Sequence, residues 1–351
     1  MIVGREALSL ATSAFLAALT SAGVAFVIYR LAARLGLIDF PSDRSSHVRP
    51  TPRGGGLGLL AGAGIGTIVL ALLGYLPGPS LLALLLATVA IAVLGAVDDV
   101  RSLPPYYRLL AQAVIAAALT VALGAVDRLP LPPPLDVDLG WLGIPLTVLW
   151  LVAVTNFYNF MDGIDGLATG QGVATSAGIA LAGFSAGATD FVVIVAGAGV
   201  GFFLLNRPPA RIFLGDVGST ALGFLLAATP LLASHGDRHR ALLAVAIGLS
   251  IFLLDPTVTL LRRLRTPAKL ATAHREHAYQ RLAAAHNRHG PTTAYLVGAG
   301  LVLSIVGGLS YRAGGPGWPY VALGVAAYCL LVVQVARAAP SVLNRDRETG
   351  A

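Results

Sequence analysis

Long apolar runs alternate with short polar stretches along this chain. Eleven of the runs approach the roughly 20 residues that a helix needs to cross the hydrocarbon core of a bilayer. They cover residues 8–30, 56–76, 79–97, 108–126, 141–161, 166–185, 190–206, 217–234, 241–261, 293–311 and 318–336. An odd number of spans places the two termini on opposite sides of the membrane. The pattern therefore predicts an all-α polytopic membrane protein with about 11 transmembrane helices.

The composition supports the same class. Of the 351 residues 56% are hydrophobic and only 12% are charged, whereas about 25% of the residues of a soluble domain are charged. The 41 glycines are typical of helices that pack closely inside a membrane. The single cysteine, Cys329, excludes an intrachain disulfide and disfavours a metal–thiolate site.

The positions of the basic residues predict an orientation. Most of the 24 Lys and Arg residues fall in the polar segments after the first, third, seventh and ninth spans and in the tail. Because cytoplasmic segments carry the excess of positive charge, these segments are expected to be cytoplasmic, with the N-terminus outside and the C-terminus inside. The net charge of +7 then reflects membrane topology and does not indicate nucleic-acid binding.

The stretch NFYNFMDGIDGLA, residues 156–168, is polar and lies between two long apolar runs. Its polar side chains are two amides and two carboxylates, Asn156, Asn159, Asp162 and Asp165. On a helix the first three recur at i,i+3 and share a face. Ionisable groups at a membrane boundary are costly and usually mark a functional site. The alternative is a polar re-entrant turn.

Two further clusters precede this stretch. Residues 39–56, DFPSDRSSHVRPTPRGGG, combine Arg44, His47 and Arg53 with three glycines, which suits contact with a phosphate or nucleotide. A positively charged cytoplasmic loop is the alternative. Asp98 and Asp99 end the third span, where carboxylates oppose the helix dipole. They suit a general base with a cation partner, or a helix cap.

Two clusters follow it. In FLGDVGST, residues 213–220, Asp216 precedes a helix start and is either a Mg²⁺ ligand together with Asn159 or an N-cap, with Ser219 as the other candidate cap.

In AHREHAYQRL, residues 273–282, His274 and His277 are placed to share a helix face beside Arg275. They favour a pyrophosphate clamp, with a basic amphipathic helix on anionic lipid as the alternative. Asp255 upstream is expected to pair with an arginine. All these clusters fall on the predicted cytoplasmic face, which indicates one active-site cleft there.

These elements, in this order over residues 39–282, resemble the polyprenyl-phosphate N-acetylhexosamine-1-phosphate transferases, the MraY/WecA family. The resemblance implies one membrane domain over residues 1–351, with the C-terminal helices at 293–336, in a bacterial inner membrane. It implies transfer of N-acetylhexosamine 1-phosphate from a UDP-N-acetylhexosamine to undecaprenyl phosphate with release of UMP, as the first membrane step of envelope polysaccharide synthesis.

The resemblance also implies roles for single residues. Asp216 and Asn159 correspond to the ligands of Mg²⁺, for which Mn²⁺ is an alternative. Asp98 corresponds to a base for the lipid phosphate with Asp99 beside it, and Asp165 to the uracil contact. The expected catalytic residues are Asp98, Asp99, Asp162, His274 and His277. The expected substrate-binding residues are Asp165, Asn156, Arg44, His47, Arg53 and Arg275.

The sequence departs from the family pattern at two places. Ser45 stands where many relatives have a lysine, which bears on the roles of the first loop, and the HREH sequence replaces the histidine triplet of the lipid I synthases. The second departure argues against UDP-MurNAc-pentapeptide and favours GlcNAc or a 6-deoxy N-acetylhexosamine such as FucNAc or QuiNAc.

Three further expectations concern class and assembly. A secondary transporter is the alternative from another class, but its site would lie near the bilayer midplane, commonly between internal repeats, and this chain shows no repeat. An inactive scaffold is disfavoured by the intact set of aspartates. A homodimer is a further expectation.

Overall fold

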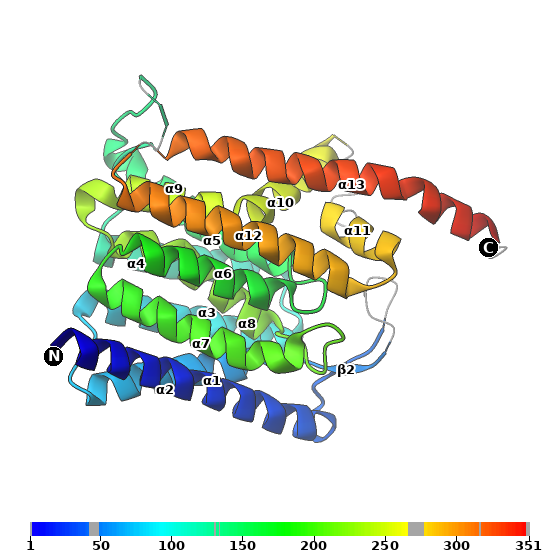
Figure 1. The fold of residues 1–351 in the computed structure, drawn as a ribbon, viewed down its shortest axis with the longest axis horizontal. Coiled ribbons are helices and arrows are strands. Elements are labelled where there is room, and N and C mark those ends of the chain that lie inside the picture. The colour runs from blue at the N-terminus through cyan, green and yellow to red at the C-terminus, as the bar shows by residue number, and fades with distance from the viewer. Residues whose placement is uncertain are drawn as a thin grey trace.

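The computed structural model describes residues 2–41, 49–129, 131–132, 134–265, 277–315 and 317–348. Within these ranges it is a bundle of helices that lie side by side (Figure 1). The α-helices are α1 Ile2–Leu35, α2 Gly56–Leu72, α3 Pro79–Arg101, α4 Pro105–Leu123, α5 Gly143–Phe160, α6 Leu167–Ala182, α7 Ala186–Asn206, α8 Asp216–Ala228, α9 Arg238–Gly248, α10 Ser250–Leu264, α11 Ala278–His286, α12 His289–Arg312 and α13 Val321–Glu348. Short 3₁₀ turns are Gly140–Leu142, Thr229–Leu232, His235–Asp237 and Trp318–Tyr320, and the strands β1 Ile38–Asp39 and β2 Thr51–Pro52 form a small antiparallel pair.

The all-α polytopic class is confirmed. In the described part of the chain seven helical segments are long and apolar enough to cross a membrane, and the pair α9–α10, bent by 77°, makes up to eight. Helices α2 and α8 are apolar but shorter. All eleven expected runs are helical, yet length and composition do not confirm eleven crossings, and the count and the orientation stay predictions.

Helices α2 and α8 meet at their first turns. A Cβ at Gly56 would lie only 2.4 Å from the Cα of Gly218, a separation that side-chain-bearing residues do not tolerate. Helix α8 also packs between α3 and α5. The small residues Gly56 and Gly218 therefore allow the N-termini of α2 and α8 to meet closely.

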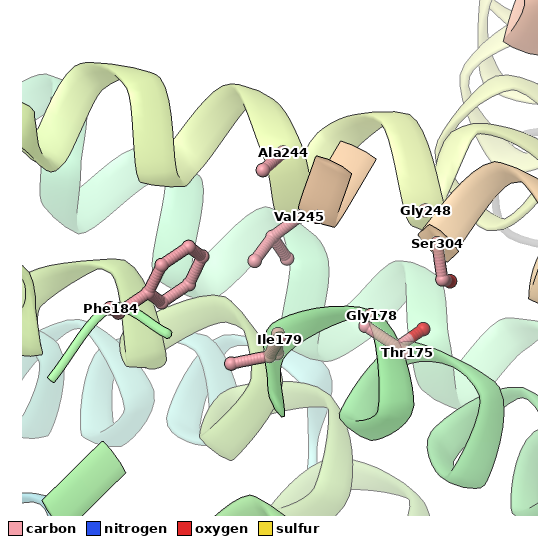
Figure 2. Close-up of a pocket in the computed structure, with 9 residues that line it drawn as sticks. Thr175, Gly178, Ile179, Phe184, Ala244, Val245, Gly248 and Ser304 are labelled. Carbon is pink, nitrogen blue, oxygen red and sulfur yellow. The ribbon is translucent and has the colours of Figure 1, made fainter. Parts of the chain in front are cut away.

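The bend between α9 and α10 is stabilised from α6. Gln171 Nε2 donates a 3.0 Å hydrogen bond to the carbonyl of Gly248, which the break removes from the regular helical ladder. Figure 2 shows the small cavity beside this bend, lined by residues of α6, α9 and α12 together with Phe184. Its volume of about 10 Å³ is at most that of one water molecule, so it is a packing feature and not a substrate site.

The polar clusters gather at the end of the bundle that carries β2 and α11, opposite the N-terminus and on the same side as the C-terminus (Figure 1). This agrees with the expectation that the clusters share one face. The hydrophobic core runs through the helices behind them.

Candidate active site

A cavity of about 340 Å³ opens at this end of the bundle. The described residues that line it include five carboxylates and one arginine. The carboxylates are Asp39, Asp99, Asp162, Asp165 and Asp216, the arginine is Arg53, and the amide side chains are Asn159 and Gln280. The cavity therefore combines most of the expected site residues that lie in the described part of the chain.

The first cluster is joined to FLGDVGST through backbone hydrogen bonds. The amide of Phe213 donates to Pro52, and the amides of Gly55 and Gly56 donate to Phe213 and Leu214, all at 2.8–2.9 Å. This short ladder places Arg53 and Asp216 on the same cavity wall, although they lie far apart in the sequence. Glycines at 55 and 56 are required, because a Cβ at either would lie within 3.0 Å of neighbouring atoms.

Asp99 caps a helix to which it does not belong. Its Oδ1 accepts a 3.1 Å hydrogen bond from the amide of Asp216, and its Oδ2 accepts a 3.0 Å bond from Val217. These are the first two amides of α8, which lack partners within their own helix. The positive end of α8 thus offsets the carboxylate's position at the negative end of α3. Asp99 is thus a helix cap that also lines the cavity, and its expected catalytic role stays a prediction.

Asp98 points to a second, much smaller cavity of about 10 Å³ that is also lined by Arg108, Asn156, Asn159 and Asp216. Its carboxylate is buried, forms an ion pair with Arg108 and accepts a hydrogen bond from the Leu103 amide at 2.6 Å. The same Arg108 nitrogen, Nη1, also lies 3.5 Å from Oδ2 of Asp216. Asp98 is therefore engaged by a cation in this conformation.

Arg108 is a site residue that the sequence analysis treated only as a topological charge. The signal was its position in the first turn of α4, shortly after the two aspartates. Two carboxylates that face one low-dielectric region need a cation between them. Because Asp98 and Asp99 therefore need a cation, the arginines nearest to them in the sequence could have been identified as candidate site residues.

The two asparagines share a face of α5 as predicted, but they do different tasks. Asn156 donates to Gln112 at 2.6 Å and lines only the small cavity. Asn159 lines both cavities, and its Oδ1 accepts a 2.6 Å hydrogen bond from Ser219. Ser219 therefore does not cap α8.

Asp162 lies just beyond the end of α5. Burial raises the pKa of its carboxyl well above the ordinary value, and the carboxylates of Asp216, Asp99 and Asp165 raise that pKa further. A carboxyl in such surroundings favours its protonated form until a cation enters its neighbourhood. The electrostatics of the cavity therefore favour a bound cation.

Asp165 is held by a residue that the sequence analysis did not identify. Its Oδ2 lies 3.1 Å from His289 Nδ1 and accepts a 3.1 Å hydrogen bond from the amide of Ala210. Thr293 donates to its carbonyl at 2.8 Å. The first turn of α12 thus orients Asp165 toward the cavity, and no motif around His289 indicated this.

The expectation for the last cluster needs correction. Helix α11 begins at Ala278, and His277 precedes it with extended backbone, so the expectation that His277 lies on a helix is wrong. The His277 ring is buried with Nδ1 3.4 Å from Asp255, and it is absent from the described lining of both cavities. Among the described residues, Asp255 pairs with this segment and with Thr259 and not with an arginine. Arg44, His47, His274 and Arg275 lie outside the described residues.

The donor set fits magnesium that is shared with a substrate. Among the described residues no three His, Cys, Asp or Glu side chains are arranged to hold a metal by themselves. Mg²⁺ is ordinarily bound by one or two protein oxygens together with substrate phosphates. The Asp216 carboxylate and the Asn159 amide oxygen, both on the wall between the two cavities, match that requirement.

Comparison with known proteins identifies the class. Residues 81–234 match the model of glycosyl transferase family 4. The chain is 30% identical over 286 residues to the probable undecaprenyl-phosphate N-acetylglucosaminyl 1-phosphate transferase of Bacillus subtilis, covering 80% of this chain and 78% of the relative. The chain belongs to this family, in agreement with the resemblance of its motifs.

Other relatives refine the comparison. The decaprenyl-phosphate N-acetylglucosaminephosphotransferase of Mycobacterium tuberculosis is 30% identical over 293 residues, covering 72% of this chain and 70% of the relative. The phospho-N-acetylmuramoyl-pentapeptide-transferase of Halalkalibacterium halodurans is 31% identical over only 200 residues, covering 53% of this chain and 62% of the relative. The similarity to the GlcNAc-named relatives thus extends over more of the chain.

Proposed function

We propose that this protein transfers an N-acetylhexosamine 1-phosphate from a UDP-sugar to a polyprenyl phosphate such as undecaprenyl phosphate. In the reaction an oxygen of the lipid phosphate attacks the β-phosphorus of the UDP-sugar. The bond from that phosphorus to the oxygen bridging the two phosphates breaks, which gives a polyprenyl-diphosphate sugar and UMP. The names of the two GlcNAc-related relatives support this reaction class.

One observation carries the assignment, namely that Asp216 lines the large cavity and that its Oδ2 also lies 3.5 Å from Arg108 Nη1. The larger cavity suits the UDP-sugar, with Arg53 as its cation and Asp165 as the proposed uracil contact. The second cavity, of about 10 Å³, is too small for a phosphate, but Arg108 beside Asp98 is 29% exposed and suits the phosphate of the acceptor. The two phosphates would then meet at Asp216.

The residues of this chain mainly position phosphates and neutralise their charge, which is what phosphoryl transfer requires. Mg²⁺ bound by Asp216 and Asn159 would neutralise charge on the diphosphate. Asp98 is a base only if Arg108 releases it. A phosphate monoester has a second pKa of about 6 and is already largely ionised at neutral pH, so the lipid phosphate reacts without a base once Arg108 has bound it.

GlcNAc is the first donor proposed, because the relatives that cover most of this chain carry that sugar in their names. Because of the HREH sequence, a UDP-linked 6-deoxy N-acetylhexosamine is the second donor proposed. In the proposed topology the site faces the cytoplasm of a bacterial inner membrane, eleven segments cross it, and the product begins an envelope polysaccharide such as an O-antigen. A homodimer remains a prediction.

The test is UMP release by the purified protein with undecaprenyl phosphate, Mg²⁺ and a panel of UDP-N-acetylhexosamines. We expect release that requires both the lipid and Mg²⁺, that stops with EDTA and that returns with excess Mg²⁺ or Mn²⁺. Activity only with UDP-MurNAc-pentapeptide would show that the donor is that of the lipid I synthases and not one of the two donors proposed. A folded protein that is inactive with every donor would contradict the transferase and favour the transporter or scaffold.

A further inference from the structure

Asp255, in the middle of α10, is fully buried and accepts four contacts that no expected site role explains. Its Oδ1 accepts a 3.0 Å hydrogen bond from the amide of Ala278, and its Oδ2 accepts a 3.0 Å bond from Tyr279. Thr259 Oγ1 donates to Oδ1 at 3.3 Å, and His277 Nδ1 lies 3.4 Å from the same oxygen. The amides are the first two of α11, so Asp255 caps α11 from another helix.

Helix α11 depends on such a cap. It spans only nine residues, Ala278–His286, and helices shorter than about 12 residues are marginal without external support. A buried carboxylate is also costly unless donors surround it. The start of α11 and the carboxylate of Asp255 therefore stabilise each other at a defined position.

The first turn of α11 forms part of the cavity. Tyr279 is fully buried, and its hydroxyl donates a 2.9 Å hydrogen bond to the carbonyl of Phe160, at the end of α5 and two residues before Asp162. Gln280 lines the large cavity. A Cβ at Gly163 would lie 2.1 Å from the Tyr279 hydroxyl and 3.0 Å from Gln280 Nε2. The position of α11 thus sets the wall beside Asp162.

We propose that Asp255 is a positioning residue for donor binding, because its carboxylate fixes the first turn of α11 and hence the position of Gln280 in the wall of the large cavity. Asp255 lines neither cavity, so it acts through α11 and not by touching substrate. This inference rests on the proposed function in so far as it assigns the donor to the large cavity. The lipid acceptor, assigned to the side of Arg108, does not depend on it.

The experiment compares Asp255→Asn with Asp255→Glu and with Thr259→Val as the matched control. Asparagine keeps one acceptor oxygen but presents N–H groups to the second amide. Glutamate keeps both acceptors on a longer side chain. Thr259→Val removes a donor to the same carboxylate but leaves both α11 amides bonded.

Two measurements are made on each full-length variant. For Asp255→Asn we expect the KM for the UDP-sugar to rise about tenfold and the ratio of kcat/KM between two UDP-N-acetylhexosamines to change, while the KM for undecaprenyl phosphate stays constant. Asp255→Glu should lie between Asp255→Asn and the unmodified protein, and Thr259→Val should match the latter. Hydrogen–deuterium exchange at Ala278 and Tyr279 should accelerate at least tenfold in Asp255→Asn, while Asp216 and Val217 stay unchanged.

The two measurements separate the possible failures. Unchanged exchange at Ala278 and Tyr279 would overturn the cap itself. Faster exchange with an unchanged donor KM and donor ratio would overturn the positioning role. A parallel rise of both KM values with a fall in kcat would reduce Asp255 to a general stabilising residue and also overturn the proposal. If the unmodified protein releases no UMP, the proposed function fails, and the exchange measurement alone still decides the cap.

Discussion

Two aspartates of this molecule do the same local task in different places. Asp99 in α3 caps the first two amides of α8, and Asp255 in α10 caps the first two amides of α11. Asp99 also lines the cavity, whereas Asp255 is fully buried behind it. The same interaction, a carboxylate that accepts the first amides of another helix, therefore either presents a charge to substrate, as at Asp99, or only fixes the position of a cavity wall, as at Asp255.

The largest effect is expected for Asp216, whose amide donates to Asp99. Replacing Asp216 with alanine removes the carboxylate shared by both cavities, and loss of a preorganised charge of this kind typically costs about a thousandfold in rate. UMP release in saturating Mg²⁺ measures it, with the melting temperature as a control for folding. Full activity of Asp216→Ala would contradict the metal assignment.

A smaller loss is expected from the cap itself. Asp99→Asn keeps one acceptor for α8 but removes a charge from the cavity, so we expect kcat to fall about a hundredfold and stability by about 1 kcal/mol. Asp255→Asn should lower kcat far less, because it removes no charge from the cavity. Equal effects of the two substitutions on kcat would mean that Asp99 is only a structural cap.

The sequence predicted most of the fold and much of the site, for identifiable reasons. Apolar runs specify helices directly, so all eleven expected segments are helical. The segment 156–168 and Asp216 were recognised because acids and amides are rare in such runs. The bend between α9 and α10 was not predicted, since the carbonyl it frees at Gly248 is satisfied by Gln171, a partner 77 positions away in the chain.

The missed site residues share the same physical origin. Arg108 acquires its role only where α3, α4 and α8 meet, because it contacts Asp98 and Asp216 at once. His289 reaches Asp165 from a distant part of the chain. His277 was expected on a helix, but Asp255 accepts hydrogen bonds from the amides that follow His277, so α11 begins one residue later, at Ala278. Pairwise contacts between distant segments are not encoded in local spacing.

A substitution of Arg108 tests the proposed binding of the acceptor phosphate. Arg108→Gln leaves the buried Asp98 without its cation, and breaking such a pair costs about 3 kcal/mol. We expect the KM for undecaprenyl phosphate to rise more than tenfold and the KM for the UDP-sugar to change little. Arg101→Gln, at an exposed position nearby, is the matched control. A selective rise in the donor KM instead would assign Arg108 to the donor and contradict its role at the acceptor.

The smallest effect concerns the contact between α11 and the loop that carries Asp162. Gly163→Ala places a methyl group 2.1 Å from the Tyr279 hydroxyl, and overpacking of this kind costs about 1–3 kcal/mol.

The matching substitution, Tyr279→Phe, removes the hydroxyl and its hydrogen bond to the carbonyl of Phe160, at a cost of about 1 kcal/mol. Of the three atoms nearest to the methyl group, the double variant keeps Gln280 Nε2 at 3.0 Å and the ring carbon at 3.2 Å. The two substitutions should therefore be less damaging together than the sum of their separate effects. Melting temperatures and donor KM values of the four proteins measure this coupling, and strict additivity would show that α11 does not bear on the Asp162 loop through Tyr279.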